Sequence, residues 1–182
     1  MANFIFDIAK RKIMDRDVTF DLETNSSGVS AGSDKLRVAL FDDTLTVATH
    51  GSAQHMANSS NGLQHTSGAN ATEIAMSGYT TGGEVLSDAE WDASSTTGAN
   101  SFAYLKGDDV AWTNLGASGQ EQIKSAVLYY DAGGTANMDS SDIPIAAFDF
   151  VVTTDGSNVT LQWAGVTGSA AAAGMGIVLK LV

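Results

Sequence analysis

Short runs of alternating apolar and polar residues, separated by Gly, Ser, Thr and Asp, fill the chain from Gly78 to Val182. Near the C-terminus, Val159, Leu161 and Trp163 alternate with polar residues. Side chains of a strand point alternately to opposite faces of a sheet, so this pattern is typical of half-buried strands. The chain has 19 glycines and a single proline, so its turns depend on residues with positive φ. The sequence therefore predicts many short strands joined by glycine-dependent turns.

The fold class follows from this pattern, because helical periodicity is almost absent after residue 14. This absence argues against folds that alternate strands with helices. We predict an all-β fold, an antiparallel β-sandwich or jelly roll of about ten short strands with a short N-terminal helix. Asp155-Gly156 is a hairpin signal between the last β segments. The expected strands are 18–22, 36–40, 73–77, 83–87, 101–105, 109–113, 123–130, 143–152, 157–164 and 176–182.

The expected helix covers residues 3–14, where apolar residues recur at four-residue spacing. Asn3 is a suitable N-cap, and Asp7 lies near the positive end of the helix dipole. Lys10, Arg11 and Lys12 fall in the last turn, where cations interact favourably with the dipole. This placement favours a solvated helix end over the alternative, docking onto an acidic partner.

We expect a single domain over residues 1–182, since chains of this length commonly form one. Within it, residues 1–24 form the helix and an arm, and residues 73–182 form the main β body. Between them, residues 49–72 are polar and lack periodicity. Loops longer than about 15 residues tend to be functional or to be ordered by a partner. Residues 49–72 are therefore predicted to be a long polar loop that acts as a contact arm.

Charge, apolar stretch length and cysteine content argue against several classes of partner and site. The formal net charge is −12 and the pI is near 4.3, so the field of the protein repels nucleic acid. No apolar stretch reaches the length of about 20 residues that a membrane span needs, and the first 15 residues lack the apolar core of a signal peptide. Cysteine is absent, which excludes disulfides, thiolate metal sites and cysteine nucleophiles.

No metal or cofactor site is predicted. His50, His55 and His65 match no zinc-ligand spacing, so we interpret them as exposed loop histidines. Calcium at residues 138–142 is the weaker alternative to a surface turn, because the segment lacks a complete EF-hand loop. The Gly78–Gly83 segment lacks the lysine and helix of a phosphate loop and is interpreted as a turn.

No catalytic residues are predicted either. The adjacent acids Asp42/Asp43 and Asp108/Asp109 do not converge, because neighbouring strand residues face opposite sides. Turn and strand-edge acids of this kind keep a surface soluble. Five aromatic residues allow a sugar-binding platform, but four lie in strand-like runs, so core packing or a subunit contact is favoured. They are Trp91, Trp112, Tyr129, Tyr130 and Trp163.

The order of several short motifs resembles a family of small virion structural proteins of tailed bacteriophages and prophages. The opening Lys10-Arg-Lys-Ile-Met-Asp15 is followed by Leu36-Arg-Val-Ala-Leu40. The later motifs are Gly78-Tyr-Thr-Thr-Gly-Gly-Glu-Val-Leu86, Gly107-Asp-Asp-Val-Ala-Trp112, Ala126-Val-Leu-Tyr-Tyr-Asp131, Pro144-Ile-Ala-Ala-Phe-Asp-Phe150 and Val159-Thr-Leu-Gln-Trp163. The resemblance covers most of the chain except residues 49–72 and 168–175.

This resemblance implies a non-enzymatic role on the capsid surface of a virion, in a protein made in the host cytoplasm. The implied function is that of a decoration or cement protein that binds the major capsid protein and itself as a dimer or trimer. The alternative is a tail, neck or fibre-associated adaptor, and a carbohydrate-binding module or glycan hydrolase is the third reading. The residues expected to contact a partner are Lys10, Arg11, Lys12, Arg16, His55 and His65.

Overall fold

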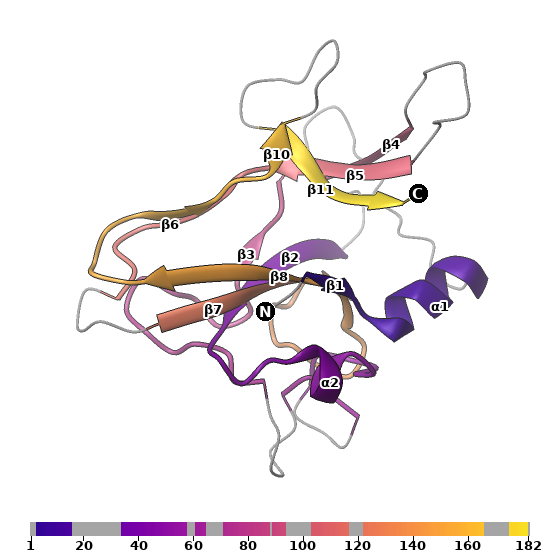
Figure 1. Cartoon of the computed structure of the whole chain (residues 1–182), viewed down its shortest axis with the longest axis horizontal. Coiled ribbons are helices and arrows are strands. Elements are labelled where there is room, and N and C mark those ends of the chain that lie inside the picture. Colours follow the sequence, from indigo (N-terminus) through magenta and orange to yellow (C-terminus); the bar gives the residue numbers. More distant parts are fainter. Residues whose placement is uncertain are drawn as a thin grey trace.

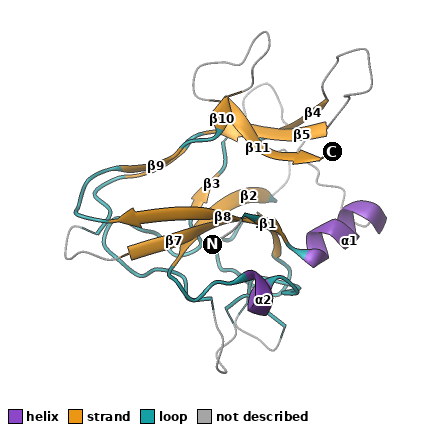
Figure 2. Cartoon of the chain, in the orientation of Figure 1, coloured by secondary structure: helices purple, strands orange, loops and turns teal. Residues whose placement is uncertain are grey.

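The computed structural model describes residues 3–15, 34–57, 61–64, 71–87, 89–93, 103–116, 122–165 and 175–181. These residues form a mostly β structure with two short helices (Figures 1 and 2). The prediction of a β-rich antiparallel fold is therefore confirmed. The sheets do not by themselves define a sandwich or a jelly roll, so that finer assignment stays a prediction.

A five-stranded antiparallel sheet in the order β1-β8-β7-β2-β3 forms the centre of the molecule (Figure 1). Its longest members are neighbours, and β7 and β8 flank the 132–142 loop. The two strands are offset by bulges in their register. The sheet consists of β1 (Phe4–Ile5), β2 (Lys35–Phe41), β3 (Glu84–Val85), β7 (Gln122–Asp131) and β8 (Ile143–Thr153).

A second sheet has four strands in the order β10-β11-β5-β4, and β6 pairs with β9 in a two-stranded ribbon. Figure 1 shows the four-stranded sheet above the central sheet and helix α2 below it. The bounds are β4 (Glu90–Ala93), β5 (Ala103–Asp108), β6 (Val110–Trp112), β9 (Val159–Leu161), β10 (Ala164–Gly165) and β11 (Met175–Leu181). Helix α1 is Asp7–Asp15, and α2 is Val47–His50.

Both faces of the central sheet are covered by apolar side chains. On one face, Leu36, Val38 and Leu40 of β2 pack in a cluster with residues of β5, β6 and β9. On the other face, Ala39 and Phe41 pack with Leu45, which precedes α2, and with apolar residues of the segments after α2. Alternating strand residues thus enter two separate cores, which is why β2 contains an almost continuous apolar run rather than a polar face.

The 49–72 segment differs from the predicted arm in the parts that the structure describes. Ala53, Met56, Leu63 and Ala71 are buried in the second core. Met56 N–H donates to the Asp142 carbonyl at 2.9 Å, which fixes the segment to the end of the 132–142 loop. These anchors were not predicted, because the buried apolar residues are spaced irregularly among small polar ones and produce no periodic signal; the role of the segment as a contact arm stays a prediction.

The start of the chain also differs from the prediction. Phe4 and Ile5 form a strand that pairs with Ala147 and Ala146, and the helix begins only at Asp7. Asn3 does not cap the helix, because its side-chain oxygen accepts the Asp149 N–H at 2.7 Å. Pairing with the edge of β8 satisfies backbone groups that a longer helix would leave outside the sheet.

The turn predicted at Asp155-Gly156 forms, with Gly156 at φ +89°. The strands on its two sides do not pair with each other, however: β8 pairs with β7 and β1, and β9 pairs with β6. Leu115 N–H donates to the Ser157 carbonyl at 3.1 Å, and Gly156 N–H donates to the Leu115 carbonyl at 2.9 Å. These bonds place the chain after the turn beside β6. The expected hairpin is therefore a crossover between sheets.

Most other strand predictions match described strands, with two exceptions. Residues 73–77 contribute only one bridge, between Glu73 and Phe41, and β4 was not predicted. The expected strand at 18–22 lies outside the described residues.

Candidate functional site

Helix α1 carries three of the predicted contact residues. Lys10 and Arg11 are exposed, whereas Lys12 is half-buried. Lys10 Nζ lies 3.0 Å from the Asp7 carboxylate, one helical turn away. In Figure 1, α1 projects at the opposite end of the molecule from the ribbon that contains β6. Arg16 and His65, also predicted to contact a partner, lie outside the described residues.

The helix is joined to the segment that follows α2. Asp7 N–H donates to the Gly51 carbonyl at 3.0 Å, and the Ile8 side chain is buried. A surface hollow of about 220 Å³ lies between them and is lined by Asp7, Ile8, Arg11, Ser52 and Gln54. Two segments that the sequence predicted separately as contacts, the basic helix and the 49–72 loop, therefore meet at one place. We call α1 together with residues 51–57 the contact surface.

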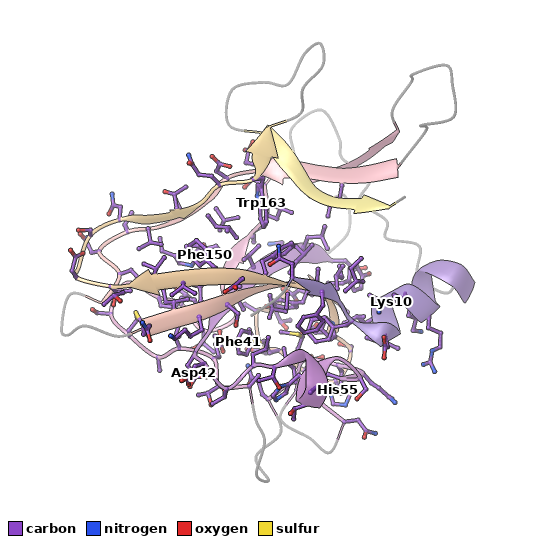
Figure 3. All side chains as sticks on the ribbon, in the orientation of Figure 1. Lys10, Phe41, Asp42, His55, Phe150 and Trp163 are labelled. Carbon is purple, nitrogen blue, oxygen red and sulfur yellow. The ribbon has the colours of Figure 1, made fainter. Side chains whose placement is uncertain are left out.

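His55 belongs to this surface but is not a freely exposed loop residue. It is half-buried, and its carbonyl accepts the Leu63 N–H at 2.8 Å. His50 is buried, with an exposed fraction of 4%, and its Nδ1 accepts the Thr46 N–H at 3.0 Å. The interpretation of these two histidines as exposed is wrong, because they lie in a segment whose apolar residues Ala53 and Met56 are buried in the second core. Figure 3 shows His55 below the central sheet.

A second polar site, which the sequence did not predict, surrounds the Thr80–Gly83 turn. The Glu73 carboxylate accepts the Tyr79 hydroxyl at 2.6 Å and the Gly82 N–H at 2.7 Å. The buried Tyr129 hydroxyl donates to the Gly82 carbonyl at 2.6 Å. Burial raises the pKa of Glu73 and of both tyrosines. Both the N–H and the carbonyl of Gly82 are thus hydrogen-bonded to side chains, which fixes the turn.

A buried ion pair adjoins this turn. Arg37 Nε lies 2.6 Å from the Asp131 carboxylate, which has no exposed surface. Arg37 also donates to the Gly83 carbonyl at 3.1 Å, and Asp131 accepts the N–H groups of Thr135 and Ala136. We call Arg37, Glu73, Tyr79, Gly82, Tyr129 and Asp131 the polar hub. It connects β2, the Thr80–Gly83 turn and the 132–142 loop.

The hub has the properties of a structural network. Each of its carboxylates accepts hydrogen bonds from neighbouring donors, and satisfied buried networks fix one arrangement of the chain. The glycines of the adjoining segment confirm the interpretation of Gly78–Gly83 as a turn, since Gly78, Gly82 and Gly83 all have positive φ. The double glycine was the one sequence signal for this site.

The remaining sequence candidates have structural roles. Asp142 is buried and accepts the N–H groups of Ala132 and Asp139 at 2.9 and 2.8 Å, so it organises the 132–142 loop. Asp42 accepts the Thr44 N–H in a local turn, and Asp109 accepts the Trp163 N–H at 3.0 Å. Among the described residues, no group of three or more His, Asp or Glu side chains could hold a metal ion.

Core packing of the aromatic residues is confirmed for Trp112 and Tyr129, which are buried. Trp163 is half-buried beside Phe148, with ring centroids 5.3 Å apart, and its Nε1–H donates to the Asp108 carbonyl. Figure 3 shows Trp163 between the central sheet and the four-stranded sheet, and Phe150 between the central sheet and the ribbon of β6 and β9. These side chains are packing residues rather than a flat platform for a sugar ring. The Trp91 side chain is outside the described set.

The burial of Asp142 should make the free energy of unfolding depend on pH. Burial raises its pKa to about 6, above the value near 3.9 of an unfolded chain. The folded state therefore binds the proton more tightly, and the contribution to stability is greatest below about pH 4 and falls as the pH rises to about 6. We expect a loss on the order of 2–3 kcal/mol from this group between pH 4 and pH 8.

Urea denaturation of the wild type and of Asp142→Asn at pH 4 to 8 tests this effect. The variant should gain stability relative to the wild type as the pH rises. Asp139→Asn is the control, because hydrogen bonds from Ser141 lower the pKa of Asp139, so its relative stability should fall with rising pH. A constant difference between wild type and Asp142→Asn would contradict the prediction.

Within the described part of the chain, no helix is both long and apolar enough to cross a membrane. Comparison with known proteins gave no match, whether with protein-family models, with curated proteins or with solved structures.

Proposed function

We propose that this chain is a non-enzymatic structural protein of a phage virion that decorates the capsid and stabilises contacts between major capsid subunits. The proposal rests on the order of the sequence motifs, which resembles small tailed-phage virion proteins, and on one structural observation. That observation is the contact surface, where exposed basic residues of α1 and residues 51–57 adjoin at one end of a firmly packed β body.

A rigid β body and repeated binding places support this role. The central sheet is buried on both faces, so the contact surface is carried by a body that does not have to be ordered on binding. A capsid presents many identical binding places, and contacts that are weak singly become strong when they act together. A small protein of this kind can therefore stabilise a shell without catalysis.

The finer fold assignment is part of the proposal. We propose that the central sheet and the strands packed on it form a β-sandwich or jelly roll. Support comes from a shared core, in which Leu105 of β5 and Trp112 of β6 pack with Leu40 of β2. Packing of strands from two sheets around one apolar layer is the arrangement of a sandwich.

Particles that lack the protein test the function. They should still assemble but should break at lower temperature or milder osmotic shock than complete particles, because the cementing contacts are missing. Equal fragility would contradict a cementing role. The copy number per particle separates the alternatives: hundreds indicate the capsid, whereas about six or twelve indicate a tail or neck adaptor.

A substitution in the contact surface tests the site. Arg11→Glu should reduce the amount of protein bound to purified particles that lack it, because charge reversal at an interface opposes association. Lys124→Glu makes the same charge change on β7 and should bind as the wild type does. Equal binding by both variants would exclude α1 from the interface.

A further inference from the structure

One step of the chain joins two residues that can react with each other. Asn61-Gly62 is the one place in the sequence where glycine follows asparagine. The backbone nitrogen after an asparagine can attack the side-chain amide carbon, because both groups are held close together in the same short segment. Glycine has no Cβ to hinder this approach and adopts a wide range of backbone angles. Among the asparagines of this sequence, Asn61 therefore has the least hindered neighbour.

The structure leaves the reacting side chain open to water and holds the main chain around it. Asn61 is exposed. Its carbonyl accepts the Gln54 N–H at 2.8 Å, and the Leu63 N–H donates to the His55 carbonyl at 2.8 Å. These bonds fix the chain on both sides of Gly62. The amide of Asn61 is thus accessible next to a main chain of defined position.

The imidazole of His55 lies against Gly62. A Cβ placed on Gly62 would lie 2.9 Å from His55 Cε1 and 1.7 Å from the Ala57 carbonyl oxygen, so only glycine fits without a shift. Cε1 is bonded to both ring nitrogens, and a ring nitrogen therefore lies beside the backbone of Gly62. Histidine is the side chain that most often acts as a general base. The group that can take the proton of the attacking nitrogen is thus next to it.

The one Asp-Gly step of the chain lacks this arrangement. At Asp155-Gly156, the Gly156 N–H donates to the Leu115 carbonyl at 2.9 Å, so the nitrogen is engaged. The Ser157 N–H donates to the Asp155 carboxylate at 3.0 Å, and hydrogen bonds from Ser157 lower the pKa of Asp155. The carboxylate therefore stays charged, and its charge opposes the approach of a nucleophile. This step is an internal comparison for Asn61-Gly62.

We propose that Asn61 is a site of self-modification, where the chain converts its own asparagine to aspartate and isoaspartate with His55 as the general base. The Gly62 nitrogen passes its proton to the imidazole and forms a bond to Asn61 Cγ. The bond from Cγ to the amide nitrogen breaks, and that nitrogen takes the proton and leaves as ammonia. Water then opens the cyclic imide at either of its carbonyls. Water is the only co-reactant, and nothing is oxidised or reduced.

The product differs from the original chain in charge and in the path of its backbone. A neutral amide is replaced by an acid, which is charged at neutral pH. In the isoaspartate product the main chain runs through Cβ and Cγ, so the carbonyl that accepts the Gln54 N–H leaves the main chain. Gln54 is therefore expected to lose the partner that holds it at residue 61. The modification thus alters residues 54–63 as the protein ages, without an enzyme.

Peptide mapping by mass spectrometry, on the purified full-length protein after warm incubation, tests the site. The exchange of an amide for an acid should be faster at Asn61 than at Asn114 and Asn158, which are also exposed but precede larger residues. Isoaspartate, resolved from aspartate by its retention time, should be more abundant at position 61 than at Asp155. Conversion at Asn61 that is no faster than at Asn114 and Asn158 would overturn the proposal.

Asn61→Gln is the matched control for the chemistry. It keeps a side-chain amide at the same exposed position, but its longer side chain has to close a larger ring. Residue 61 of this variant should keep its amide under conditions in which the wild type is converted. Loss of the amide at an equal rate in both proteins would show direct hydrolysis by water and would overturn the cyclic route.

His55→Gln tests the general base. The variant keeps a polar side chain but has no basic nitrogen, so conversion at Asn61 should slow about tenfold or more. Imidazole added to the buffer should restore part of the rate. A loosened segment would have the opposite effect, because a freer chain reaches the cyclic geometry more often. An unchanged or faster rate in the folded variant would overturn the role of His55.

Circular dichroism verifies that His55→Gln is folded. Should it not fold, the wild type in urea takes its place, since unfolding separates the imidazole from Gly62 while the sequence Asn61-Gly62 stays intact. Conversion should then be slower in urea than in the folded protein. An equal or faster rate in urea would overturn the role of His55 in the same way.

Discussion

Replacing Gly82 with alanine should destabilise the protein by about 3 kcal/mol or more, on the combined cost of a positive φ and a steric clash. Gly82 has φ +87°, and a Cβ there would lie 2.1 Å from the Ala136 carbonyl oxygen. Relief of this clash must move the turn or the 132–142 loop. Either movement disturbs the hydrogen bonds of Gly82 to Glu73 and Tyr129.

Gly133→Ala is the matched control. Gly133 has φ +90°, but a new Cβ there would lie 4.0 Å from Thr135 Cγ2, which is an ordinary van der Waals contact. This variant should therefore show only the conformational cost of about 1 kcal/mol. Urea denaturation measures both. Similar losses of unfolding free energy in the two variants would contradict the prediction, because the turn would then accommodate the Cβ without a steric cost. If Gly82→Ala fails to fold, the prediction is supported only if Gly133→Ala folds normally.

Removal of Arg37 should have an effect of similar size. Arg37→Met keeps most of the side-chain stem but leaves the Asp131 carboxylate buried without its cation. Breaking a buried pair on one side typically costs about 3–5 kcal/mol, because an uncompensated charge remains in the interior. The neighbouring N–H donors of Thr135 and Ala136 retain part of the carboxylate's hydrogen bonding, so the lower half of this range is expected.

A double variant and a surface control complete the experiment. Arg37→Met/Asp131→Asn should be less destabilised than the sum of the two single variants, since the second substitution removes the stranded charge. Lys10→Met removes the cation from the exposed pair with Asp7 and should cost no more than about 1 kcal/mol. Additive effects at Arg37 and Asp131 would show that the pair is not coupled.

The sequence predicts local features of this fold well. Alternation located β7 and β8 within a few residues, and the glycines of the Gly78–Gly83 segment identified its turn. These features depend on neighbouring residues, so a single sequence contains them. The exposed basic residues of α1 were likewise visible as a cluster before their position in space was known.

Long-range partners could not be predicted in the same way. Arg37 and Asp131 are 94 positions apart, and no local pattern joins them. The turn at Asp155-Gly156 was visible, but a turn signal does not say which strand β9 will pair with, and β6 was its partner. The buried apolar residues within 49–72 could not be predicted, because they follow no helical or strand period.

The pairing of β1 has a consequence for synthesis of the chain. Phe4 and Ile5 find their partners at Ala147 and Ala146, so the first strand has to wait until most of the polypeptide has left the ribosome. Pairing over such a separation is slow compared with the formation of the neighbouring β7 and β8. Helix α1 follows directly on β1 and is positioned with it. A nascent chain therefore cannot fix α1 in its final place until β8 has been synthesised.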